Sequence, residues 1–482
     1  MIKIKNKMKK YITLFVATTA VLTASCSESL DDINKNPNAT EIPDPAYLLT
    51  GVEKNGADLY WGNSADYGGT ELFVQHWAAI QYPDADKYDI TNTAGIVTTP
   101  WSTGYTTLIT NLNAILALND ETANSNYKGA ALTLRSWVFL LLTDLYGDIP
   151  YSEVGKSIVP KYDTQKEVYV GLLADLTQAA SQLDAAKGTV KGDVIYGGDV
   201  AKWKKFANSL KLRIALRISD KEDALAKSTI AALSVADLIG SNDETARFVY
   251  STSPYNNPQQ DHFVSRNDYR ISKTIVDKLK ALSDPRLPVY AQLPKDETVT
   301  DYAGGANGLL AADAMSQGLD KISLPGIYFL TNTAPAVIYS HAEVLFNLSE
   351  AVARGYISGD AEDYYKQAIT ASFNQFGITD ATVIADYLAQ PAVAYNAANY
   401  KQSIGEQKWL AFFGQGLDAF AEWRRLDYPQ LVAGPASVLE GKIPTRVFYP
   451  GTEQSLNGKN YKAAVANQGA DLLTTTLWFD AY

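Results

Sequence analysis

A helical spacing of apolar residues, repeated along much of the chain, constrains the fold more than any other sequence feature. Over residues 127–146 the apolar side chains recur at steps of three and four residues, which places them on one helical face. They are Leu134, Trp137, Val138, Leu141 and Leu145. Gly147 follows and predicts the end of this helix. Further helices are predicted over residues 165–184, 201–219 and 221–233.

A pair of helices is predicted later in the chain. The first covers 342–355 and ends at Gly355, and the second covers 361–377 and ends at Gly377. Two helices of about 15 residues joined by a short turn resemble a tetratricopeptide repeat. Their predicted inward-facing residues are Leu345, Leu348, Val352, Tyr365, Ile369, Phe373 and Phe376. One last helix, over 406–426, carries on one side Trp409, Phe412, Phe413, Phe420 and Trp423.

Two long stretches between these helices have a different composition. Residues 56–106 and 235–335 are rich in Gly, Asn, Pro, Asp and Tyr. Irregular segments of such length inside a domain are usually functional loops. No break in composition marks a second domain. The sequence therefore predicts one all-α domain over residues 46–482 that carries long irregular loops.

The N-terminus has the plan of a secretory signal peptide. Five lysines precede residues 11–23, which are apolar and uncharged, and small residues follow. This stretch is shorter than the roughly 20 residues of a membrane-spanning helix. Cys26 is the only cysteine in the chain. It indicates a lipoprotein processing site, with residues 1–25 removed, Cys26 acylated and residues 26–45 serving as a polar tether to the membrane.

Composition and motifs argue against several kinds of function. The net charge of −11 disfavours a nucleic-acid partner. The three histidines have no zinc-ligand spacing, and neither a nucleophile elbow nor a phosphate-binding loop is present. We predict no catalytic residue, cofactor or metal. A pair of distant glycosidase carboxylates leaves no local spacing, so an α-helical glycosidase stays open as an alternative.

Aromatic residues in the irregular stretches point to a carbohydrate ligand. Flat rings cover the apolar C–H faces of sugars, while amide and charged groups bond the hydroxyls. Trp77 and Trp101 lie in or at the start of helical patterns and are predicted to be core. The candidate ligand-binding residues are Tyr60, Trp61, Tyr82, Asp86 and Tyr88 in the first stretch, and Tyr255, Asn257, His262, Arg266 and Tyr269 in the second.

Six stretches in the same order resemble one known family. They are LTASCSE, TDLYGDIPYSE, SDPRLPVYA, IYSHAEVLFNLSEA, QKWLAFFGQGLDAFAEWRRLDYP and IPTRVFYPGTEQSLNGKNYKAA. Together they resemble the SusD/RagB family of outer-membrane nutrient-binding lipoproteins, over nearly the whole chain. The resemblance implies an all-α fold in which tetratricopeptide-like helix pairs form a right-handed scaffold. It places Arg424 and Arg425 in that scaffold rather than in a ligand site.

The resemblance also implies a function. The protein would be held at the cell surface of the outer membrane by its N-terminal lipid. It would bind an oligosaccharide or glycopeptide, without cleaving it, and deliver it to a SusC-like TonB-dependent transporter. By position, residues 60–105 and 254–270 would form the ligand site. A lipid-anchored helical-repeat scaffold that binds a protein or peptide cargo is the first alternative to this function, and the α-helical glycosidase is the second.

Overall fold

The computed structural model describes residues 43–480. From Pro45 onward the chain forms one compact unit. The predicted signal peptide, Cys26 and all but the end of the predicted tether lie outside the described residues.

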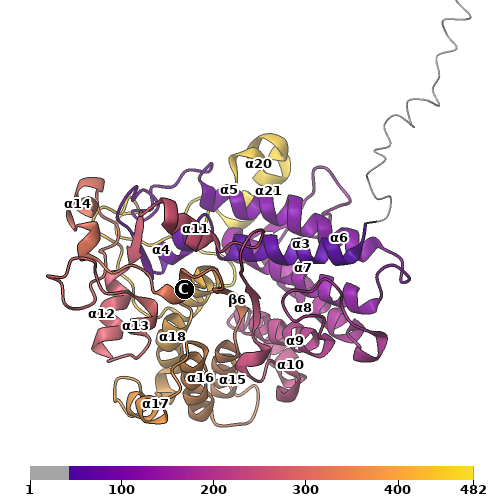
Figure 1. Ribbon diagram of the computed structural model, residues 1–482. Helices are drawn as coiled ribbons and strands as arrows, with labels where there is room; N and C mark the ends of the chain where they lie inside the picture. Colours follow the sequence, from indigo (N-terminus) through magenta and orange to yellow (C-terminus); the bar gives the residue numbers. More distant parts are fainter. Residues whose placement is uncertain (1–42, 481–482) are drawn as a thin grey trace, which may run out of the picture. The chain divides into compact units, whose positions relative to one another are not determined.

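Helices make up most of this unit (Figure 1). The longer ones are α3 (Pro45–Tyr60), α7 (Ser125–Tyr146), α8 (Gln165–Gln182), α9 (Val200–Arg217), α15 (His341–Ala353), α16 (Ala361–Gln375), α18 (Tyr400–Ala411), α19 (Gly416–Leu426) and α21 (Gly458–Gln468). The shorter ones are α4 (Glu71–Phe73), α5 (Gly95–Ser102), α6 (Thr110–Ala117), α10 (Asp223–Ala231), α11 (Pro258–Ser265), α12 (Lys273–Ala281), α13 (Leu287–Tyr290), α14 (Ala311–Ser316), α17 (Ala381–Leu388) and α20 (Gly451–Leu456).

Strands are few and short. They form three antiparallel pairs, β1 (Trp77–Ala79) with β5 (Tyr269–Ile271), β2 (Ile149–Pro150) with β3 (Tyr162–Asp163), and β4 (Ala246–Val249) with β6 (Pro335–Tyr339). The prediction of an all-α fold is confirmed.

Helix α7 is largely buried and confirms the helix predicted over 127–146. Its five predicted inward-facing residues are all buried, and so is most of the rest of the helix. The Asn124 side chain caps its start, and Gly147, with φ 88°, follows its last residue. Helix α8 packs beside α7, and an ion pair of 3.0 Å joins Arg135 to Asp175 across the two helices.

Helices α15 and α16 form the predicted pair. Phe346 and Tyr365 pack ring against ring, with centroids 6.2 Å apart, and the Ser349 hydroxyl donates to the carbonyl of Ala361 at 2.7 Å. All the predicted inward-facing residues are buried except Val352, which is half-buried. The Ser340 and Asp360 side chains cap the two N-termini.

The prediction of one helix over 406–426 was wrong in one respect, because the structure contains two helices there. Helix α18 ends at Ala411 and α19 begins at Gly416. Gly414 lies between them with φ 81°, a conformation that glycine adopts without strain. Two carboxylates from the first third of the chain accept hydrogen bonds at this break: Glu71 Oε1 from Gly414 N–H at 3.0 Å, and Asp66 Oδ1 from Gly416 N–H at 2.8 Å.

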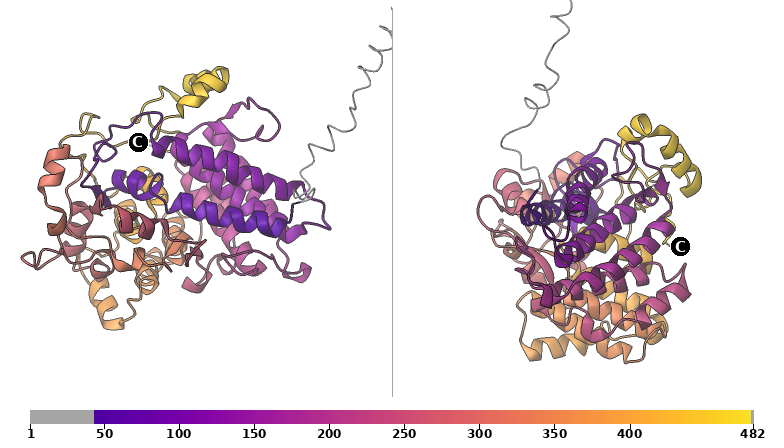
Figure 2. Two further views of the ribbon diagram at one scale, coloured as in Figure 1. Left: turned by 45° about the horizontal axis from the view of Figure 1, so that its top comes forward. Right: turned by 90° about the vertical axis from the view of Figure 1, so that its right-hand side faces the viewer.

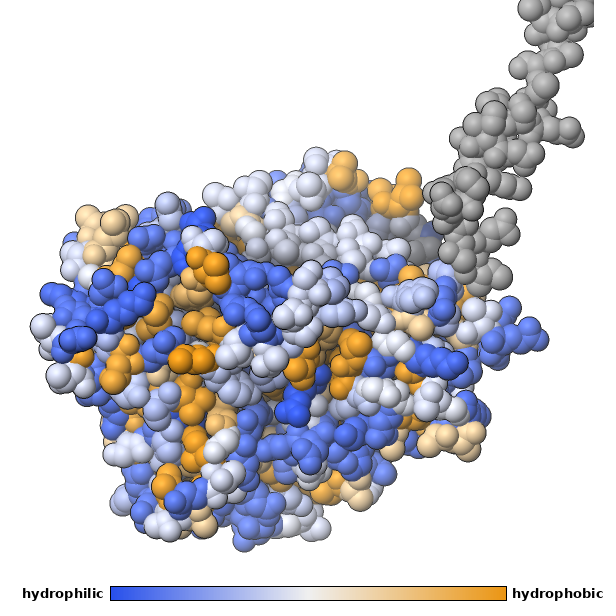
Figure 3. Space-filling view, viewed as in Figure 1, coloured by the Kyte–Doolittle hydropathy of each residue, from blue (hydrophilic) through white to orange (hydrophobic). Residues whose placement is uncertain are grey.

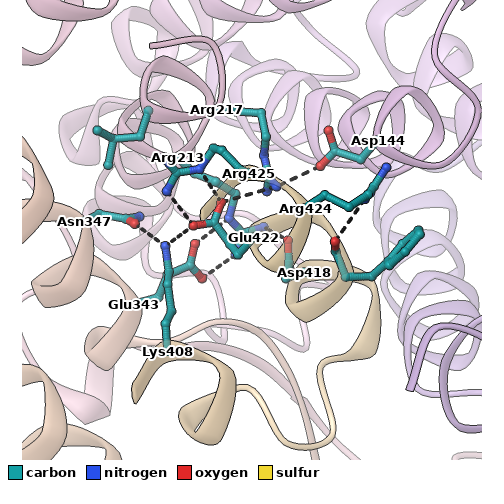
Figure 4. Close-up of polar contacts among 12 residues, drawn as sticks. Asp144, Arg213, Arg217, Glu343, Asn347, Lys408, Asp418, Glu422, Arg424 and Arg425 are labelled. Carbon is teal, nitrogen blue, oxygen red and sulfur yellow. Dashed lines mark hydrogen bonds and ion pairs between the residues drawn. The ribbon is translucent and has the colours of Figure 1, made fainter. Parts of the chain in front are cut away.

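A buried lattice of charges joins α7, α9, α15, α18 and α19 (Figure 4). Glu422 lies at its centre and pairs with Arg217, Lys408 and Arg425. Arg213 bridges Glu343 and Asp418, and Arg425 also pairs with Glu350. These contacts confirm that Arg425 serves the scaffold. Arg424 is likewise buried, and its guanidinium lies over the Phe420 ring at 3.9 Å.

The long helices and the irregular segments occupy different parts of the compact unit. Helices α3, α6, α7 and α8 lie side by side in one half, and α11 to α14 with their connecting loops lie in the other (Figures 1 and 2). Both predicted ligand stretches contribute to the irregular half. The scaffold thus leaves one region in which loops set the surface.

Candidate functional site

Strands β1 and β5 bring the two predicted ligand stretches together. Trp77 pairs with Ile271 and Ala79 with Tyr269 across this ribbon. The contact continues past the strands, because the carbonyl of Asp268 accepts hydrogen bonds from the N–H groups of Ile80 and Gln81. Residues separated by about 190 positions in the sequence therefore form one surface.

Tyr82 is the exposed aromatic residue at this junction. The residue has 73% of its surface exposed. Its backbone has φ 51°, in the left-handed region that a bulky residue rarely adopts. Such strain persists only where the surrounding structure holds it, and it is common at functional sites. The loop thus displays an aromatic ring to solvent in a fixed backbone conformation.

Arg266 lies against this ring. Its guanidinium carbon is 5.3 Å from the centroid of the Tyr82 ring, within the range of a cation–π contact. Its Nε donates to the Asp268 carboxylate at 2.7 Å, and Asp268 also fixes the loop of Tyr82 through its backbone carbonyl. Arg266 and Tyr82, both predicted from the sequence, are therefore held next to each other.

Beneath the surface lies a cluster of aromatic rings. Tyr67, His262 and Tyr269 contact one another with centroids 5.3 to 5.5 Å apart. Trp77 and Phe263 pack beside them, with centroids 5.8 Å apart. Burial lowers the pKa of His262, against the opposing effect of Asp268, and raises the pKa of Tyr269 to about 12. His262 and Tyr269 are therefore neutral at pH 7 and make a rigid base for the surface.

A cleft of about 370 Å³ opens beside Arg266. Its lining comes from the end of α11 and from three distant loop positions, and comprises Phe263, Val264, Ser265, Arg266, Asn267, Lys295, Leu324 and Leu330. Figure 3 shows apolar residues among polar ones on the face that carries α11. Val264, near the end of α11, has 82% of its surface exposed. The cleft combines apolar walls with polar and cationic groups.

Asp86 holds the Tyr82 loop from the inside. Its carboxylate accepts hydrogen bonds from the N–H groups of Ala79 and Gly308 and from the side-chain amide of Asn307, at 2.8 to 3.2 Å. Burial raises its pKa to about 7, although these three donors oppose the shift. Asp86 was predicted to bind ligand directly, but it is buried and instead supports the loop.

Four other predicted residues are buried and make their contacts within the protein. The Tyr60 hydroxyl donates to Asp418 at 2.6 Å, and Trp61 Nε1 donates to Asn257 at 3.2 Å. Asn257 caps α11 and also donates to the carbonyls of Phe329 and Thr331. Tyr88 packs edge-on against Phe73. Side chains without exposed surface offer no contact to a ligand, so these residues belong to the support of the site.

The remaining candidate residues differ in how much of their surface is exposed. Tyr82 and Arg266 are exposed, while Tyr255, His262 and Tyr269 are half-buried. Tyr255 packs on Phe248, with centroids 6.0 Å apart. The sequence reading missed Lys295, Leu324 and Leu330, which line the cleft from another part of the chain. No local pattern marks them, since only the tertiary fold brings them to α11.

A second cleft, of about 600 Å³, lies along α15 and α16 near residues 240–243. Its lining includes Asn242, His341, Lys366 and Thr370 but no Tyr, Trp or Phe. It is roomier than the cleft at α11, yet it offers no Tyr, Trp or Phe ring for a sugar face. We therefore place the candidate site at Tyr82 and the α11 cleft.

The chain matches a family model over residues 37–450, and that model, SusD-like, is described as starch-binding and associating with the outer membrane. The chain belongs to the SusD-like family. The resemblance to the SusD/RagB family is thereby confirmed. Among curated proteins no sequence matches the chain.

Solved structures of SusD-like proteins share the fold. A chitin-binding protein is 29% identical, with a TM-score of 0.80 over 91% of this chain and 100% of its own. A SusD homologue from Bacteroides uniformis is 26% identical, with a TM-score of 0.81 over 90% of this chain and 100% of its own. One from Bacteroides fragilis is 26% identical, with a TM-score of 0.76 over 89% and 99%.

The SusD-like family is associated with the outer membrane. Within residues 43–480, no helix is both long enough and apolar enough to cross a membrane.

Proposed function

We propose that this SusD-like protein binds an oligosaccharide or glycopeptide at the outer surface of the outer membrane. It passes the ligand to a SusC-like TonB-dependent transporter and performs no chemistry on it. Membership of a family described as starch-binding supports a glycan ligand, and so does the relative described as chitin-binding. The predicted lipid on Cys26 would supply the attachment to the membrane.

The single observation that carries the proposal is the display of Tyr82. An exposed ring in a strained, internally braced loop has no role in the core, because most of its surface is in water. Such a ring suits the apolar face of a sugar unit. The adjoining cleft is large enough for about one or two further units, given that small-ligand sites measure roughly 300–1,000 Å³.

The test is a calorimetric titration with a panel of oligosaccharides that includes chitohexaose. Tyr82→Ala should weaken binding about tenfold, in line with the value of one aromatic contact. Tyr47→Ala is the matched control, because Tyr47 on α3 is 80% exposed but lies outside the site. Equal affinities of the Tyr82→Ala variant and the unmodified protein for the oligosaccharide would contradict the placement of the ligand site at Tyr82.

A separate incubation distinguishes binding from catalysis. Prolonged incubation with fluorescently labelled oligosaccharides should return them at unchanged length. Shortened products that persist after repurification of the protein would instead indicate a glycosidase.

The membrane attachment has its own prediction. Cys26→Ala should move the protein from the membrane fraction to the soluble fraction, because acyl chains on Cys26 are the proposed anchor. The measurement is fractionation of cells that express each form, with Cys26→Ser as a second variant. Retention of both variants in the membrane fraction would contradict the lipoprotein assignment.

A further inference from the structure

We propose that the α11 cleft is specific for oligosaccharides that carry a carboxylate or sulfate group. The inference rests on the proposed function and adds the charge of the ligand to it. The α11 cleft here means the 370 Å³ cleft lined by residues 263–267, Lys295, Leu324 and Leu330.

The charge of the lining is opposite to that of the protein. Arg266 and Lys295 are both among the lining residues, and none of those residues is Asp or Glu. The whole chain, in contrast, carries a net charge of −11. Two cations without a lining carboxylate on an acidic protein create a local region that attracts anions.

Arg266 is oriented for such a ligand. Asp268 occupies its Nε at 2.7 Å and fixes the direction of the guanidinium, which Tyr82 also contacts. Its two terminal amino groups have no hydrogen-bond acceptor among the described residues, and 51% of the side chain is exposed. A guanidinium with a free edge matches the two oxygens of a carboxylate or sulfate.

Lys295 supplies the second charge from a separate loop. Its side chain is exposed, and no carboxylate of the described residues lies within ion-pair distance of it. Since Asp268 offsets part of the charge on Arg266, Lys295 provides the cation of the cleft that has no counter-ion. An anionic group bound here would lie between the two side chains.

The other lining groups suit the neutral part of a sugar. Phe263, Val264 and Leu330 form apolar walls, and Asn267 offers an amide. The side-chain oxygen of Asn267, Oδ1, already accepts from Arg270 Nη1 at 2.8 Å. This leaves the side-chain NH₂ group of Asn267 to donate to a ligand oxygen. The cleft therefore combines recognition of a ring with recognition of a charge.

The experiment compares sugars that differ only in charge. The probes are hexagalacturonic acid against its full methyl ester, and a keratan-type hexasaccharide with and without its 6-O-sulfates, together with chitohexaose as a further neutral sugar. We expect at least one charged probe to bind about tenfold more tightly than its neutral partner at low ionic strength. The difference should shrink as salt is added, because exposed charges are screened.

Variants locate the effect in the cleft. Lys295→Gln and Arg266→Gln should each bring the ratio of the charged-probe affinity to the neutral-partner affinity close to one. Lys227→Gln, an exposed lysine on α10, is the matched control and should keep the preference. Unchanged thermal unfolding midpoints verify that the variants are folded.

The outcomes separate this inference from the proposed function. Saturable binding of neutral probes with no preference for charge would overturn the inference and leave the proposed function standing. A preference for charge that persists in Lys295→Gln and Arg266→Gln would also overturn it. Absence of binding to every probe, charged or neutral, would contradict both.

Discussion

Asp86 shows how one residue can link the loop of Tyr82 to pH. Its folded-state pKa of about 7 lies above the value of an exposed Asp. The folded protein therefore keeps the proton on Asp86 at pH values where the unfolded chain has released it. The contribution of Asp86 to the unfolding free energy is therefore fully present below about pH 4. It is lost as the pH rises toward 7, and the loss is at most about 1.4 kcal/mol for each pH unit.

The measurement is urea unfolding between pH 4 and pH 8 for the unmodified protein and Asp86→Asn. The difference in unfolding free energy between the two should fall as pH rises, because only the carboxyl group titrates. Asp84→Asn is the control, since Asp84 lies in the same loop with 72% of its side chain exposed. If the difference in unfolding free energy between the unmodified protein and Asp86→Asn stayed constant from pH 4 to pH 8, the raised pKa of Asp86 would be contradicted.

Among single residues, the sequence could indicate which stretches display aromatic rings but not which rings are exposed. Tyr82 and Trp61 both have Asp and other polar residues among their sequence neighbours. Trp61 is buried because Asn257 and Phe329, about 200 to 270 positions away, cover it. Tyr82 is exposed because its loop holds the ring at the surface, beside Arg266. Neither cause is visible in the local sequence.

At the scale of elements, the break between α18 and α19 depends on Gly414. A Cβ atom there would lie 3.0 Å from the Phe329 ring and 3.2 Å from the Trp61 ring, at a φ that disfavours every other residue. Gly414→Ala should therefore lower the unfolding free energy by about 1–3 kcal/mol. Chemical denaturation measures the effect.

Gly51, inside α3, is the matched control for that substitution. It has ordinary helical surroundings, and a Cβ atom at this position would have open space within 4 Å. Gly51→Ala should stabilise the protein by about 0.5–1 kcal/mol, because alanine favours a helix. A similar effect of both substitutions would show that the conformation at Gly414 is unimportant.

The helices themselves were largely predictable from the sequence. The apolar spacing predicts that these helices exist, and Gly147 correctly predicts that α7 ends at Tyr146. The division of residues 406–426 was not predictable. It requires Asp66 and Glu71 to reach backbone N–H groups some 340 positions later, and the apolar pattern continues across the break.

For the molecule as a whole, the charge lattice around Glu422 holds five helices in one arrangement. Burial raises the pKa of Glu422, but Arg425, Lys408 and Arg217 outweigh that effect and keep the pKa well below its ordinary range. Glu422→Gln would leave these buried cations without their shared partner. We expect a loss of about 3–5 kcal/mol in unfolding free energy.

Glu362→Gln tests whether burial is the reason for the large loss of stability expected from Glu422→Gln. Glu362 pairs with Lys366 four residues along α16, and both side chains are about half exposed. Its loss should change stability by less than about 0.5 kcal/mol in the same denaturation experiment. Comparable losses for the two variants would contradict the role given to the lattice.

The contacts that fix the Tyr82 loop also impose an order on biosynthesis. Asp66 and Glu71 bond to residues 414–416, Gln75 bonds to Val432, and the carbonyl of Lys87 accepts from Val438. The loop and its partners Asp268, Asn307 and Gly308 are thus translated before these other partners, which lie among the last 70 or so residues. A nascent chain interrupted before residue 414 would contain Tyr82 and Arg266 and still lack every one of these later contacts.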